Sequence, residues 1–136
     1  MRAVLLDINA YVRFLAGDDR VLSCLTCAGR VYISVFVLGE LVARFRAGSK
    51  EKQNRKILDR FLAKSSVVVL DATRETAEYF GLIKAALKKS GQPIPLNDVW
   101  IAAHALETGA VLVTYDSHFR AVPGLRTWAE LGEPGL

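Results

Sequence analysis

The sequence predicts an α/β fold in which helices flank a central, mostly parallel sheet of four to five strands. Short apolar runs rich in β-branched residues, none alternating polar with apolar positions, cover 3–6, 31–34, 67–70 and 111–114. Such runs are typical of strands buried on both faces, as parallel strands are. Helical patterns separate the runs, which favours strands joined by crossover helices.

The helices are expected from capping residues and from the periodicity of apolar positions. Ser34, for example, can cap a helix that Gly48 ends. The expected helices have approximate bounds of 18–28, 34–47, 50–64, 73–90 and 97–109. A further helix can follow Asp7, and a last short strand is expected over 125–128.

Length and composition predict a single domain over 1–136, without a linker or an internal repeat. Of the 136 residues, 51% are hydrophobic and 24% are charged, which is ordinary for a globular domain. No apolar run reaches the roughly 20 residues that span a bilayer. The start of the sequence has no secretory cleavage pattern. We therefore expect a cytoplasmic protein with no membrane partner.

Cys24 and Cys27 form a lone CxxC pair, which can belong to a redox motif or to half of a zinc site. No second pair exists, and His104 and His118 are far away in sequence. Thiols three positions apart on a helix share a face. We therefore interpret both cysteines as small apolar core residues.

Positive charge is concentrated in one segment of the chain. Eight of the 18 lysines and arginines lie between Arg44 and Lys64, although the net charge is only +4. Such a run is usually a solvated helix face, but it also suits a polyanion such as nucleic acid. Lys52, Arg55 and Lys56 lie largely off the apolar stripe of the expected helix, which makes them candidate contacts for nucleic acid.

Acidic residues recur at the carboxyl ends of the predicted strands, where parallel α/β sheets bind ligands. Asp7, Asp71 and Asp116 follow strands, whereas Glu40 and Asp98 lie in apolar stretches of helices. Each has an alternative interpretation, because an aspartate can cap a helix or form a turn. Four carboxylates in apolar surroundings would repel one another unless a cation joined them. Hard oxygen ligands suit Mg²⁺ or Mn²⁺, so we expect a divalent-metal site.

Four motifs, in order, carry a resemblance that spans nearly the whole chain: LLDINAYVRFL, SVFVLGEL, PLNDVWIAAHA and LVTYDSHF. They resemble the motifs of PIN-domain ribonucleases, and most closely those of VapC-type toxins. The resemblance implies a PIN-like three-layer sandwich and a metal-dependent endoribonuclease, the toxin of a type II toxin–antitoxin system. It also implies Mg²⁺ or Mn²⁺ as cofactor, an RNA substrate, a homodimer and an inhibiting antitoxin protein.

The resemblance also assigns roles to residues. The implied catalytic and metal-binding acids are Asp7, Glu40, Asp98 and Asp116. The implied supporting polar groups are Asn9, Ser34, Asn97 and Thr114. Phosphodiester hydrolysis at such a site leaves a 5′-phosphate and a 3′-hydroxyl. The basic candidates Lys52, Arg55 and Lys56 would then contact RNA.

The sequence departs from the family pattern at several positions. Ile8 and Val37 stand where many members have a hydroxyl group, and Tyr115 stands where a smaller or polar residue is common. Asp71 matches no family acid, so we interpret it as a surface residue or a cap. His118 is interpreted as a packing residue or an RNA contact.

Other classes of protein gather acids on similar sheets. Receiver domains need an acidic pair directly after the first strand and a lysine after a late strand, and this sequence has neither. Haloacid-dehalogenase phosphatases need aspartates at alternate positions, where this chain has Asp7 and Asn9. A non-catalytic RNA- or protein-binding domain of the same fold stays open, as does a nuclease that acts on DNA.

Overall fold

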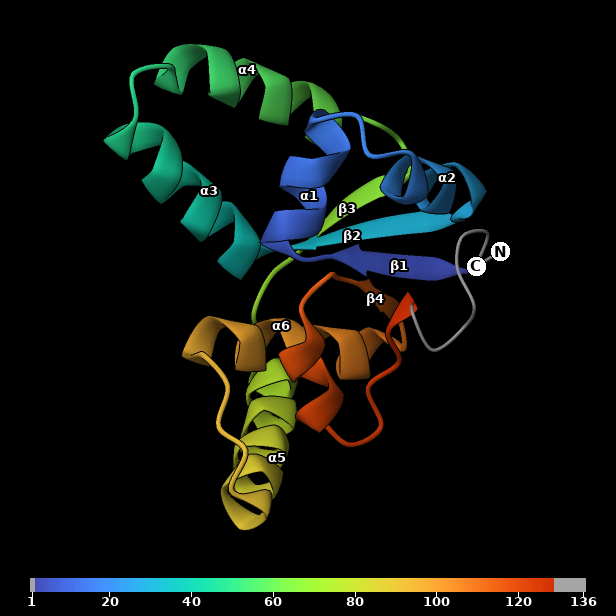
Figure 1. Ribbon diagram of the computed structural model, residues 1–136, viewed down its shortest axis with the longest axis vertical. Coiled ribbons are helices and arrows are strands. Elements are labelled where there is room, and N and C mark those ends of the chain that lie inside the picture. The colour runs from blue at the N-terminus through green and yellow to red at the C-terminus, as the bar shows by residue number, and fades with distance from the viewer. Residues whose placement is uncertain (1, 129–136) are drawn as a thin grey trace.

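The computed structural model describes residues 2–128, and a four-stranded sheet lies at its centre (Figure 1). All neighbouring strands run parallel, in the order β3-β2-β1-β4. The strands are β1 Ala3–Leu6, β2 Arg30–Ser34, β3 Val67–Leu70 and β4 Val111–Val113. The predicted α/β class with a parallel sheet is confirmed.

Helices cover both faces of the sheet. The chain moves from β1 through β2 to β3 in one direction and then returns to β4 on the opposite edge. Right-handed crossovers therefore place the later helices on the other face. Figure 1 shows α1 to α4 on one side of the sheet and α5 and α6 on the other. The helices are α1 Ile8–Leu15, α2 Asp19–Cys27, α3 Val35–Ala47, α4 Glu51–Leu62, α5 Arg74–Ser90, α6 Leu96–Thr108 and the short 3₁₀ helix η1 Ser117–Ala121.

Local hydrogen bonds define where these helices begin and end. Asp18 and Ser34 cap α2 and α3 with side-chain oxygens that accept backbone N–H groups. Thr73 begins α5 with a reciprocal capping box. The last turns of α5 and α6 are followed by Gly91 and Gly109 at φ 70° and 74°, a conformation that glycine adopts without steric cost.

Two expectations need correction. The segment predicted as a fifth strand pairs with β4 only through one isolated bridge, between Thr127 and Leu112. The chain turns at Gly124 (φ 78°) three residues before this bridge, so within the described residues the segment has come beside β4 only at Thr127. Cys24 is buried as predicted, but Cys27 is exposed because it is the last residue of α2.

The packing of α6 brings distant parts of the chain together. The Trp100 ring stacks between Phe36 of α3 and Phe80 of α5, with centroid distances of 4.9 and 4.0 Å. The middle of α6 is buried against the sheet, and even its histidine, His104, is 1% exposed. This packing places the first turn of α6 beside α3. Among the described residues, no helix is long and apolar enough to cross a membrane.

Candidate active site

The four predicted acids line one cleft of about 480 Å³ at the carboxyl edge of the sheet. Asp7 follows β1 and Asp116 follows β4, which are paired neighbours in the sheet. Glu40 comes from α3, and Asp98 comes from the first turn of α6. The topology therefore joins four separate segments of sequence in a single acidic cleft.

Asp7 lies at the bottom of this arrangement and is 4% exposed. One carboxylate oxygen accepts the Ala10 N–H at 2.7 Å and caps α1, as the capping alternative predicted. The other accepts the Thr114 hydroxyl, which in turn accepts the Asp116 N–H at 2.9 Å. Burial raises the pKa of Asp7 to about 6, against the effect of these hydrogen bonds. Negative charge on Asp98 and Asp116 raises that pKa further.

Glu40 and Asn97 form a polar pair across the mouth of the acidic cleft. The Asn97 amide donates to Glu40 Oε1 at 3.1 Å. Asn9 is exposed and lines the same cleft beside Asp7. Arg44, one turn beyond Glu40 on α3, lines it too. Arg44 is thus the part of the basic segment that the fold brings to the acids.

His118 makes contacts that sequence reasoning missed. Its Nε2 lies 2.6 Å from Asp98 Oδ2, and its Nδ1 lies 2.7 Å from Asp116 Oδ1. Burial raises the pKa of Asp98, and the hydrogen bond from His118 opposes this effect. The interpretation of His118 as a packing residue missed both contacts, and its interpretation as an RNA contact stays a prediction. In the sequence, only the position of His118 two residues after Asp116 could have indicated this contact. The 3₁₀ helix η1 is what directs its ring toward both carboxylates.

Ser34 lies in the core, and its hydroxyl contacts groups other than the four acids. It caps α3 through the Phe36 N–H at 3.0 Å, and it lies 2.9 Å from His104 Nδ1. His104 Nε2 in turn lies 3.1 Å from the Asp71 carbonyl oxygen. Burial lowers the pKa of His104, which favours its neutral form. Ser34 therefore ties α3 to α6 beneath the acidic cleft.

The remaining positions from the sequence fall in different surroundings. Asp71 is exposed and outside the acidic cleft. Val37 is fully buried, whereas Ile8 lines the cleft as an apolar wall. Lys52 and Lys56 are exposed on α4.

The helix that carries the basic candidates stands apart from the acids. Arg55 of α4 pairs with Glu51 at 2.9 Å. Figure 1 shows α4 beyond α1, on the far side of the sheet from α6. The fold therefore does not bring α4 to the acidic cleft.

The donor set fits a divalent cation. The four carboxylates and the amide oxygens of Asn9 and Asn97 are hard ligands of the kind that Mg²⁺ and Mn²⁺ prefer. One ligand atom from each of Asp98, Asp116 and His118 lies within 4.8 Å of the others. A buried, ionised Asp7 also needs a nearby positive charge.

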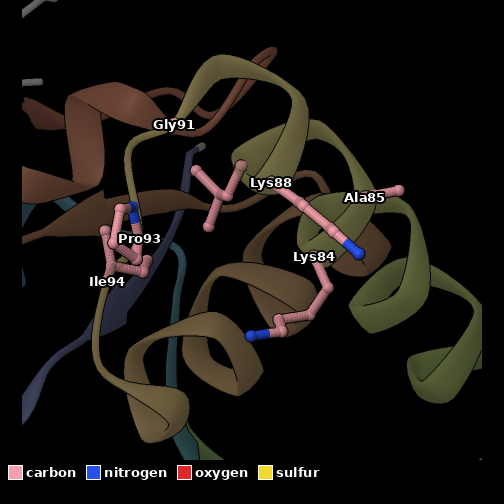
Figure 2. Close-up of a pocket in the computed structure, with 7 residues that line it drawn as sticks. Lys84, Ala85, Lys88, Gly91, Pro93 and Ile94 are labelled. Carbon is pink, nitrogen blue, oxygen red and sulfur yellow. The ribbon is translucent and has the colours of Figure 1, made fainter.

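A second hollow, of about 450 Å³, lies between the last turns of α5 and the loop that follows it (Figure 2). Pro93 and Ile94 form one side, and Lys84, Leu87 and Lys88 of α5 form the other. None of the residues that line it has a carboxylate, hydroxyl or imidazole side chain, so no side chain there suits a metal.

Comparison with known proteins identifies the family. Residues 4–125 match the family model described as PIN domain. Ribonuclease VapC2 of Haemophilus influenzae is 36% identical over 101 residues, which cover 74% of this chain and 75% of that protein.

The chain belongs to the PIN-domain family, among the VapC ribonucleases.

Two further relatives support this placement in the PIN-domain family. The tRNA(fMet)-specific endonuclease VapC of Shigella flexneri is 33% identical, over 73% of this chain and 74% of its own. The crystal structure of VapBC2 from Rickettsia felis, bound to a DNA fragment from its promoter, contains a similar chain. It has a TM-score of 0.83 and 29% identity, over 92% of this chain and 96% of the other. The resemblance seen in the sequence motifs is confirmed.

Proposed function

We propose that this PIN-domain protein is a metal-dependent endoribonuclease and the toxin of a toxin–antitoxin pair. The observation that carries the proposal is the acidic cleft, in which Asp7, Glu40, Asp98 and Asp116 converge. Carboxylates that are close together and partly buried repel one another and destabilise a fold unless a bound cation neutralises them. The VapC names of the relatives support ribonuclease activity for this chain.

Each residue has a defined part in the proposed reaction. The four acids would hold Mg²⁺ or Mn²⁺, and a bound divalent ion neutralises the scissile phosphate and lowers the pKa of an attacking water. Thr114 orients Asp7, and Asn97 orients Glu40. His118 holds Asp98 and Asp116 at a fixed separation. A carboxylate of the cleft accepts the proton of the attacking water.

The proposed partners follow from similar proteins. Several solved structures similar to this chain are VapBC structures, and one of these, VapBC-5 from Mycobacterium tuberculosis, is a member of the VapBC family of toxin–antitoxin systems. We therefore propose an antitoxin that covers the acidic cleft, with a cationic side chain directed at the carboxylates. The homodimer implied by the resemblance is also proposed. Light scattering of the purified protein tests it.

A non-catalytic binding domain of the same fold is less well supported. Four carboxylates that line one cleft repel a polyanionic ligand such as RNA unless a cation joins them, so an RNA-binding role without a metal is not favoured. The alternative nuclease activity is cleavage of DNA. Parallel assays on RNA and on single-stranded DNA of the same sequence separate the two.

The proposal is tested by changing one ligand while keeping its size. Asp98→Asn removes a charge from the cleft and keeps the first turn of α6, so folding should persist. We expect RNA cleavage in Mg²⁺ or Mn²⁺ to fall by about 100-fold or more, because a metal ligand is lost. Gel analysis of a labelled RNA, with and without EDTA, measures the effect.

Asp71→Asn is the matched control, because Asp71 also follows a strand but lies exposed outside the acidic cleft. Its cleavage rate should equal that of the wild type. Cleavage by Asp98→Asn at the wild-type rate, or full activity of the wild type in EDTA, would overturn the proposal.

A further inference from the structure

The acidic cleft continues into two neighbouring hollows, and Asp116 lines all three. The first neighbour is lined by Asn9, Arg13 and Tyr115, and shares Asn9 with the cleft. The second shares Tyr115 with the first and is also lined by arginines of α2 and η1, Arg20 and Arg120. A continuous depression therefore leads from the carboxylates to a region rich in arginine.

Aromatic rings organise this region, which we call the arginine groove (Arg13, Arg20, Tyr115, Arg120 and Trp128). The Arg13 guanidinium carbon lies 4.2 Å from the centroid of the Tyr115 ring, and that of Arg20 lies 5.2 Å from the Trp128 ring. The Trp128 indole N–H donates to the Thr114 carbonyl at 2.6 Å, which fixes the floor beside the acids.

Tyr115 departs from the family pattern, and its contacts show what it does here. Its hydroxyl donates to Asp18 Oδ2 at 2.7 Å, and its ring packs edge-on against Trp128 at 5.1 Å. It thereby joins the end of β4 to the start of α2, and places Arg13 above its face. Arginines held by stacking lose little further side-chain freedom when they bind an anion.

Charge makes this groove a suitable path for a polyanion. The acidic cleft repels the phosphates on either side of the scissile bond, so cations beside the cleft must hold them. Asp18 offsets part of the positive charge of Arg13. Arg120 is exposed and lines the same hollow as Asp116 and Tyr115. The basic face of α4, by contrast, lies away from the acidic cleft (Figure 1).

We infer that single-stranded RNA enters through the arginine groove, with Arg13 and Arg120 binding phosphates next to the one at the acidic cleft. The inference rests on the proposed ribonuclease function and names the surface that holds its substrate. Guanidinium groups suit phosphate because their planar N–H donors match its oxygens. Trp128 is 1% exposed, and the Arg13 and Arg20 guanidiniums lie over the Tyr115 ring, so the two rings support the arginines from beneath.

The test compares two charge-matched double variants. Arg13→Glu with Arg120→Glu alters the groove, and Arg55→Glu with Lys56→Glu alters α4. Each pair lowers the net charge from +4 to zero, so overall charge cannot explain a difference. Fluorescence anisotropy of a labelled single-stranded RNA is measured in EDTA over a series of salt concentrations. Thermal melts establish that both variants are folded.

The groove variant should bind RNA at least about 10-fold more weakly at low salt. Its salt slope should fall by about 1.4, because two phosphate contacts are lost. The α4 variant should stay close to the wild type. A single Arg120→Gln variant, which adds no negative charge, should lose about 0.7 of the slope.

Equal weakening in both double variants, or a larger effect from α4, would overturn the inference. An acidic protein segment as the real occupant of the groove would also overturn it, and would leave RNA affinity unchanged in the groove variant. Binding in EDTA is independent of the cleavage assay. If the groove variant bound RNA like the wild type while Asp98→Asn was inactive, the inference about the arginine groove would be wrong and the ribonuclease proposal would stand.

Discussion

Asp7 is the residue at which burial and charge oppose each other most strongly. Its pKa rises from 3.8 to about 6 on folding, mainly through burial. A carboxyl with a raised pKa binds more protons in the folded than in the unfolded state between those two values. Without metal, the free energy of unfolding therefore decreases as the pH rises from 3.8 to about 6, and the loss is complete above that. The pKa difference corresponds to roughly 3 kcal/mol.

Asp7→Asn should therefore stabilise the metal-free protein at neutral pH. Asparagine keeps the cap on α1 and removes the buried charge. We expect a Tm about 10 °C above that of the wild type at pH 7.5 in EDTA, and a vanishing difference near pH 4. Thermal melts across this pH range measure it, with Asp71→Asn as the exposed control. A variant that is less stable than the wild type at every pH would show that the charge is compensated in another way.

His118 gives a second prediction at the residue scale. Its ring nitrogens hold Asp98 and Asp116 at 2.6 and 2.7 Å, so its loss should leave both carboxylates free to rotate. Hydrogen bonds to metal ligands contribute roughly 10- to 100-fold to metal affinity. His118→Ala should weaken Mn²⁺ binding by about 10-fold, measured by isothermal calorimetry. Ser117→Ala, the adjacent residue of η1, should bind as the wild type does. Unchanged Mn²⁺ affinity in His118→Ala would refute this role.

At the scale of elements, α6 determines whether the acids meet. Trp100 stacks on Phe36 and Phe80 and so joins α6 to α3 and α5. The Ser34–His104 contact joins α3 to α6 at a second point. Glu40 and Asn97 can face each other across the cleft because these contacts fix the separation of the two helices.

Trp100→Ala should therefore affect both stability and the metal site. Because the Trp100 ring is half-buried, its removal should lower the free energy of unfolding by about 2–4 kcal/mol. Urea denaturation measures this decrease. Mn²⁺ affinity should fall with it, because the first turn of α6 is no longer held against α3. Leu82→Ala on α5 is the control, since that side chain is 64% exposed and should change stability by less than about 0.5 kcal/mol. A Trp100→Ala protein with the stability of the control would show that the stacked rings do not hold the helices.

At the scale of the whole molecule, positive and negative charges lie in different places and serve two functions, attraction of RNA and binding of a metal. A net charge of +4 favours association with a polyanion, while the acids are confined to one cleft. Positive charge lies beside the cleft in the arginine groove, and also on α4 farther away. The fold can therefore attract RNA as a whole and still reserve its carboxylates for a metal.

The proposed toxin activity leads to a prediction in living cells. Expression of the wild-type chain without an antitoxin should slow bacterial growth, because cellular RNA is cut. Expression of Asp98→Asn to the same level, checked by immunoblot, should not. Growth curves after induction compare the two. Equal growth arrest by both proteins would indicate toxicity unrelated to the acidic cleft.

The sequence by itself determined the strands and the positions of Asp7 and Asp116. Buried parallel strands leave a local signature of consecutive apolar residues, and the residues that follow them must meet at one edge of the sheet. Capping residues such as Ser34 likewise act within a few positions of the chain. The four family motifs are also local stretches of sequence, and they add Glu40 and Asp98 to this edge.

Only the tertiary structure decided how the acids are held and what lies beside them. His118 reaches Asp98 because η1 packs beside α6, and Tyr115 reaches Asp18 across a separation of 97 residues. The same holds for Trp100, whose ring partners come from α3 and α5. Such contacts depend on the angles and distances between packed elements, which no local pattern encodes. Hydrophobic periodicity says which face of an element is buried, but not which side chain it meets.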